Sequence, residues 1–114
     1  MNYLQKEMPD GKIAIYRVMR DKQGDTVHIW TGKSYKNKKK ARQVEWAFEM
    51  VSSVWAYNGK DLDNRYLQKY YDEGVSRKVI EAEFDWLAHN TDTVYAGEDS
   101  EGISYNAVIY SPKA

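Results

Sequence analysis

The chain has 114 residues, of which 42% are hydrophobic and 30% charged, and it contains no Cys. This length and composition predict one folded domain and differ from those of disordered, fibrous and membrane proteins. Without Cys, disulfides, thiolate nucleophiles and cysteine-ligated zinc are excluded. Together with the lack of a signal-peptide pattern, this favours the cytoplasm.

The formal net charge of zero conceals an asymmetry along the chain. Residues 1 to 60 carry 12 Lys and Arg against 6 Asp and Glu, whereas residues 61 to 114 carry 5 against 11. Either the two halves pair with each other or each half faces a separate partner. Tyr occurs 10 times and Phe twice, which fits half-exposed rings at an interface and core rings with surface hydroxyls equally well.

The N-terminal part predicts a β-hairpin after a short polar leader to Gly11. The segments Lys12 to Arg20 and Thr26 to Thr31 alternate in polarity around a Gly-containing turn, and Gly32-Lys33-Ser34 is expected to end the second strand. With Asp21 facing Asp25, one face of the hairpin is typical of a core. The other face is apolar enough to need a cover, whether a helix, a second subunit or a partner, and it holds Ala14, Tyr16, Val18, His28 and Trp30.

The central part predicts three helices. A long helix from about Asn37 to Tyr57 follows from apolar residues at alternating spacings of three and four, and Trp46, Met50 and Tyr57 widen its apolar arc enough for cover on two sides. A shorter helix is expected from Leu62 to about Glu73 with Asp61 as its cap. A third is expected from Arg77 to His89, capped by Ser76.

The C-terminal part predicts a closing hairpin, with strands at Thr93 to Ala96 and Ile103 to Tyr110 around an acidic loop. The resulting order is β-β-α-α-α-β-β. It favours an α+β fold in which a layer of three helices covers a four-stranded antiparallel sheet.

A dense run of basic residues lies at the start of the long helix, where the helix dipole makes cations unfavourable. Because breaches of local preference tend to mark function, the run is a candidate anion or nucleic-acid site. A solvated charged turn, neutralised by the acidic half of the chain, is the alternative. The run consists of Lys33, Lys36, Lys38, Lys39, Lys40 and Arg42.

One charged residue falls inside each of two apolar faces. Arg17 interrupts the core face of the first predicted strand, and Glu83 lies within the apolar face of the third helix. Two such residues are expected to form a buried, hydrogen-bonded ion pair that fixes how helix and sheet dock. A carboxylate reaching water, or a catalytic acid, are the other interpretations of Glu83.

Motifs for catalysis or cofactor binding are weak. The segment Thr31-Gly32-Lys33-Ser34 lacks the upstream glycine of a phosphate loop, because that position is Val27. A match to the calcium-binding loop is broken at Tyr66, which stands where that loop requires a glycine. The two histidines, His28 and His89, lie on different elements. We therefore expect no cofactor, no metal and no enzyme activity.

These observations favour a non-catalytic protein-binding module, an inhibitor or regulator that docks on a larger partner. By analogy alone, small neutral domains of this kind include phage anti-defence proteins such as anti-CRISPR proteins. A nucleic-acid-binding accessory protein using the basic run is the alternative. A homodimer would also cover the apolar faces. The expected partner-binding residues are Tyr16, Trp30, Trp46, Met50 and Tyr57.

Overall fold

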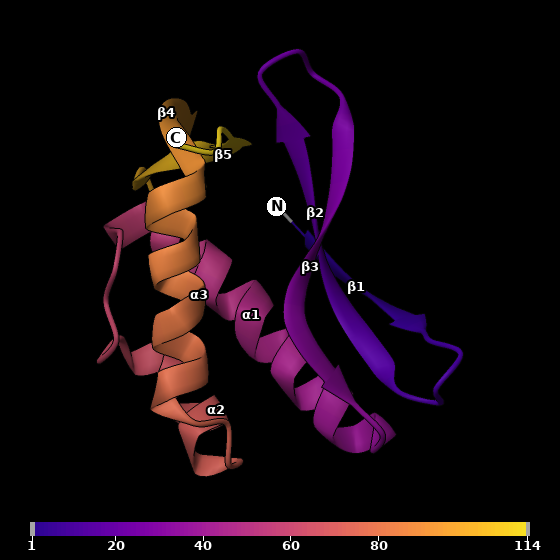
Figure 1. Cartoon of the computed structure of the whole chain (residues 1–114). Coiled ribbons are helices and arrows are strands. Elements are labelled where there is room, and N and C mark those ends of the chain that lie inside the picture. Colours follow the sequence, from indigo (N-terminus) through magenta and orange to yellow (C-terminus); the bar gives the residue numbers. More distant parts are fainter. Residues whose placement is uncertain (1, 114) are drawn as a thin grey trace.

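Two N-terminal hairpin turns join three strands, three helices follow, and a hairpin closes the chain (Figure 1). The computed structural model describes residues 2–113, and its order of elements is β-β-β-α-α-α-β-β. The strands are β1 (Asn2–Glu7), β2 (Ile13–Asp21), β3 (Thr26–Tyr35), β4 (Thr91–Glu98) and β5 (Ser104–Tyr110). The helices are α1 (Lys38–Asn58), a 3-10 turn η1 (Arg65–Leu67), α2 (Gln68–Asp72) and α3 (Arg77–Asn90).

The polar leader expected up to Gly11 is instead a strand. β1 pairs antiparallel with β2 along its whole length, from Asn2 opposite Val18 to Glu7 opposite Ile13. Only Tyr3 of this strand is buried. A strand on the rim of a sheet with one buried side chain shows no polarity alternation, and for this reason the sequence did not reveal it.

The hairpin of β2 and β3 has the predicted register. The N–H of Asp21 donates to the carbonyl of Asp25 at 2.9 Å, and Arg17 lies opposite Ile29. The prediction that Gly32 ends the second strand is wrong, because β3 continues to Tyr35 through a bulge. Gly32 has a φ of 81°, a conformation open to glycine, and the hydroxyl of Thr31 donates to the carbonyl of Ile15 at 2.8 Å.

The sheet has five strands and is mixed, which corrects the expected four-stranded antiparallel sheet. β5 runs parallel to β2 and pairs with it only at Arg20 with Ile109 and Asp21 with Tyr110. β1 and β5 both lie along the same edge of β2. β5 pairs with the last two residues of β2 and turns away from this strand where its pairing with β1 begins. Such long-range parallel pairing leaves no local signal in a sequence.

The α1 and α3 predictions are confirmed to within about a residue. Asn37 caps α1 by accepting from the N–H of Lys40, and Ser76 caps α3 by accepting from that of Val79. The expected helix from Leu62 to Glu73 is wrong at its start, since the helical part is reduced to η1 and α2 and the cap is Asn64. The hydroxyl of Tyr71 donates to the carbonyl of Leu62 at 2.6 Å and holds that segment as a turn.

The core lies between α1, α3 and one side of the β1–β3 sheet. We call this side the inner face. Its central side chain, Ile15, is fully buried, as are Phe48 of α1 and Phe84 of α3. Among the described residues, no helix is long and apolar enough to cross a membrane.

Candidate functional site

The side of the β1–β3 sheet that points away from the helices is the main uncovered surface, and we call it the outer face. Figure 1 shows α1 and α3 on one side of these strands only. The pairing register assigns its members across the three strands. They are Asn2, Leu4, Lys6, Ala14, Tyr16, Val18, Arg20, Thr26, His28, Trp30 and Ser34.

Tyr16 and Trp30 form the aromatic centre of the outer face. They lie directly opposite each other across β2 and β3, and Trp30 is 52% exposed. The ammonium of Lys6 lies 4.4 Å from the centre of the Tyr16 ring, and the indole N–H of Trp30 donates to the carbonyl of Lys33 at 3.3 Å. Both rings are therefore held in place on rigid strands.

A notch opens beside this pair. It has a volume of about 510 Å³ and lies between the β1–β2 turn and the β3 bulge. Apolar groups from Met8, Pro9 and Ala14 line it together with the two aromatic rings, and Lys12 and Asp10 stand at its rim. The carboxylate of Asp10 accepts from the backbone N–H of Lys12 at 2.9 Å.

The other three aromatic or Met candidates lie away from the outer face, on α1. Trp46 is 49% exposed, with the Arg42 guanidinium 5.9 Å from its ring centre. Met50 packs partly against the core, and Tyr57 donates to Asp99 at 3.1 Å. The five predicted partner-binding residues therefore divide between two surfaces.

Around Met50 and Tyr57 lies a second, smaller apolar surface. It holds a hollow of about 370 Å³, to which Tyr66 and Ile103 also contribute. The sequence placed Tyr66 on the predicted second helix and Ile103 at the start of the last predicted strand, but it could not show that these two segments meet beside α1. Asp99 and Glu101 give its rim an acidic side.

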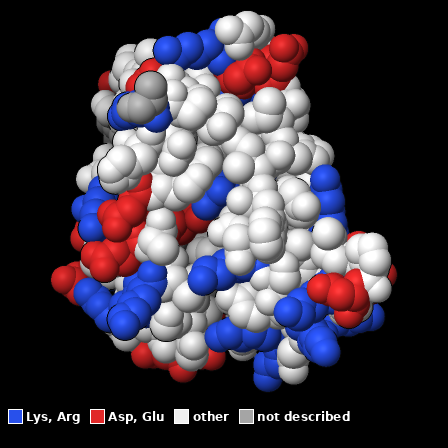
Figure 2. All heavy atoms as spheres, in the orientation of Figure 1, with Lys and Arg blue, Asp and Glu red and all other residues white. Residues whose placement is uncertain are grey.

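The six residues of the basic run are exposed or half-buried around the start of α1. Blue side chains gather at the lower right of Figure 2, where Figure 1 places that helix start. Within residues 2–113, none of the six has a carboxylate oxygen within 4.0 Å. Lys40 donates to the carbonyl of Gly74 at 3.2 Å.

The acidic half pairs with other cations. Lys60 contacts Glu81 and Asp85 at 3.1 and 3.0 Å, and Lys22 lies 3.8 Å from Asp92. Pairing between the halves therefore occurs, but it does not reach the basic run. In the described part of the chain, the acidic half forms no direct ion pair with that run.

The structure brings Arg17 and Glu83 together in the core. Two parallel bonds of 2.7 Å join the guanidinium to the carboxylate, and both side chains are almost fully buried. The hydroxyl of Tyr3 donates to the same carboxylate at 2.6 Å, and the guanidinium lies 3.6 Å from the Trp86 ring centre. Burial first, and then the negative charge of Glu83, raise the pKa of Tyr3 well above its usual value.

All polar groups of this cluster are thus directed at each other. Glu83 receives three donated hydrogen bonds, and a further N–H of Arg17 donates to the carbonyl of Trp30 at 3.2 Å. The arrangement joins α3 to β1 and β2 and links it to β3, as expected of a docking pair.

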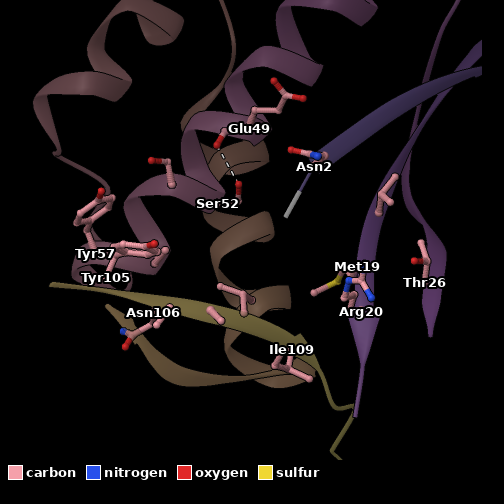
Figure 3. A pocket seen from close by; sticks show the side chains of 16 residues that line it. Asn2, Met19, Arg20, Thr26, Glu49, Ser52, Tyr57, Tyr105, Asn106 and Ile109 are labelled. Carbon is pink, nitrogen blue, oxygen red and sulfur yellow. Dashed lines mark hydrogen bonds between the residues drawn. The ribbon is translucent and has the colours of Figure 1, made fainter. Parts of the chain in front are cut away.

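A cavity of about 690 Å³ lies between the second half of α1, the end of β2 and the diverging β5 (Figure 3). Glu49 is the one carboxylate on its wall. Burial and the nearby charge of Glu45 raise the pKa of Glu49. The Ser52 hydroxyl donates to the carbonyl of Glu49 at 2.9 Å. Among residues 2–113, no group of three His, Asp or Glu could hold a metal ion.

Sequence reasoning missed the outer-face residues of β1, which are Asn2, Leu4 and Lys6, because that segment was assigned as a polar leader. Their partners, Val18, Tyr16 and Ala14, were correctly assigned to one face of β2. The segment Asn2–Glu7 has one buried ring among mostly polar residues and no alternation from which a strand could have been predicted.

No family model, curated protein sequence or solved structure is detectably similar to this chain. Its function must therefore be argued from its own surfaces.

Proposed function

We propose that the protein is a non-catalytic protein-binding module that docks on a larger partner through the outer face. It would act as an inhibitor or regulator by occupying the partner's surface. The observation that carries the proposal is Trp30, which is 52% exposed and lies opposite the half-buried Tyr16 on a sheet face with no helix over it (Figure 1).

The physical argument is that rigid aromatic rings lose little conformational entropy on binding and bring a large contact area. Trp and Tyr are for this reason enriched among the residues that dominate binding energy. The adjoining notch supplies a concave site for a partner side chain. Polar residues of β3, among them His28 and Ser34, lie on the same face as the rings, and a polar rim is usual at protein interfaces.

The test is affinity capture from nuclease-treated extract of the native cell, with tagged wild-type protein beside two variants. Trp30→Ala removes the proposed anchor. Tyr66→Ala removes another exposed aromatic ring, 55% exposed, from the second surface. The proposal expects a partner that wild type and Tyr66→Ala retain and Trp30→Ala loses. Capture that is unaffected by Trp30→Ala would contradict it.

A second candidate is a nucleic-acid-binding function of the basic run. The observation that favours it is six cations with no carboxylate within 4.0 Å in the described part of the chain. Four or more phosphate contacts should make affinity fall by at least about tenfold between 50 and 200 mM salt. Binding of labelled oligonucleotides, lost in the Lys38→Glu, Lys39→Glu, Lys40→Glu triple variant and retained in Trp30→Ala, would favour this candidate.

A further inference from the structure

The charge of the outer face is one-sided. The strand residues assigned to it include Lys6 and Arg20 and no Asp or Glu. Lys12 stands at the rim of the notch, and the single carboxylate beside it, Asp10, is engaged by a backbone N–H. Glu7 lies opposite Ile13 and so belongs to the inner side of the sheet. The outer face and its notch therefore carry three cations, Lys6, Lys12 and Arg20, against one carboxylate, Asp10.

This charge argues against a second copy as the occupant. A two-fold interface brings the same patch of both subunits together. The cations Lys6, Lys12 and Arg20 of one copy would then meet a face whose strand residues include no Asp or Glu, so like charges would oppose association. The occupant that complements the face is acidic.

The state of the two rings favours a protein over a nucleic acid. Single-stranded nucleic acids bind by stacking successive bases on exposed ring faces. The Lys6 ammonium already lies over the Tyr16 ring at 4.4 Å, and Tyr16 is half-buried. Trp30 is left as one free ring beside a notch of about 510 Å³. That geometry suits a single apolar side chain seated in the notch.

We propose that the outer face binds an acidic segment of a partner protein. The segment would place one large apolar side chain in the notch beside Trp30 and Asp or Glu side chains opposite Lys6 and Lys12. Arg20, about 20 Å from Ala14 along β2, contacts only a segment long enough to cross the face. This inference rests on the proposed function and specifies the chemistry of its partner.

The probe is a library of random short peptides displayed on phage, selected on the wild-type protein and counter-selected on Trp30→Ala. Enriched peptides should combine Asp or Glu with one large apolar residue. By fluorescence anisotropy, a synthesised peptide should lose at least about tenfold in affinity on Lys6→Glu, Lys12→Glu, because repulsion replaces attraction. The matched control is Lys69→Glu, Lys78→Glu, which makes the same charge change on exposed residues of α2 and α3 and should leave affinity unchanged.

Several results would overturn the inference. These are neutral or basic enriched peptides, equal losses in both double variants, or no peptide that depends on Trp30. A labelled single-stranded oligonucleotide that binds wild type and is lost on Trp30→Ala would overturn it in favour of nucleic acid. A concentration-dependent dimer abolished by Trp30→Ala would do so in favour of a second copy.

A different result would show that the proposed function itself is wrong. That result is capture of a partner that does not depend on Trp30. If capture does depend on Trp30 but the captured partner binds Lys6→Glu, Lys12→Glu as well as wild type, only the acidic chemistry is wrong.

Discussion

The inner and outer faces of the β1–β3 sheet are built from alternating residues of the same strands, but they differ in what covers them. The inner face carries Ile15 and Arg17 under α1 and α3, and its one buried cation is neutralised by Glu83. The outer face carries Tyr16 and Trp30 and has no helix over it. Apolar side chains on both faces of a sheet covered on one side are the reason we propose a purpose other than folding for the bare face.

Five predictions test this contrast, and the largest effect is expected on the inner face. Glu83→Ala should lower the free energy of unfolding by about 3 to 5 kcal/mol, because it leaves Arg17 buried without its partner. Urea denaturation measures the change. Asp63→Ala, which breaks the exposed contact of 3.0 Å with Arg77, is the control and should cost at most about 1 kcal/mol.

A double variant, Arg17→Ala with Glu83→Ala, should be less destabilised than the sum of the single variants, since each single loss includes an unpaired buried group. Additive losses would mean that the two side chains do not interact.

Tyr3→Phe should cost about 1.5 to 3 kcal/mol, the range for a hydrogen bond to a charged group. The pKa of Tyr3 is raised above 10.0 by burial and by Glu83. The protonated hydroxyl of Tyr3 is therefore favoured in the folded state. Its stabilising effect is complete below pH 10 and is lost as pH rises further. Thermal melts from pH 8 to 11 should show a smaller decline for Tyr3→Phe than for wild type. Parallel declines would contradict this role.

Gly32→Ala tests the bulge that shapes the rim of the outer face. At a φ of 81°, no neighbouring atom would meet the new side chain, so the expected loss of about 1 to 2 kcal/mol comes from the backbone alone. Gly32→Asn should lose less, because Asn tolerates this conformation. Equal stability of Gly32→Ala and wild type in urea would show that the strand can end before this residue.

The smallest effect on folding is expected for Trp30→Ala. A half-exposed ring that no helix covers contributes little to the folded state, and we expect a change within about 0.5 kcal/mol in the free energy of unfolding. A loss comparable with that of Glu83→Ala would mean that Trp30 stabilises the fold as inner-face residues do, and the contrast between the two faces would not hold.

Much of the fold could be predicted because local signals agree with it. The Gly-containing turn set the register of β2 and β3, apolar spacing gave α1, and apolar spacing with Ser76 as cap gave α3. Arg17 and Glu83 could be paired from sequence because each breaks an otherwise apolar face, and buried charges need partners.

The remainder depends on contacts that a sequence does not display. β1 has one buried ring, and the parallel pairing of β2 with β5 joins segments at opposite ends of the chain. The segment after Asp61 has helical composition, but Asn64 caps a later start, at Arg65. For the candidate site, alternation grouped Tyr16 with Trp30 but could not show that the face stays bare, or that Lys6 lies on it.

The most direct test of the central claim is the affinity of a captured partner for Trp30→Ala, measured beside the stability of the same variant. The account predicts a binding loss of about 2 kcal/mol or more, as for an interface hot spot, with nearly unchanged unfolding. Undiminished binding by Trp30→Ala, with normal folding, would contradict the claim that the outer face is the protein's functional surface.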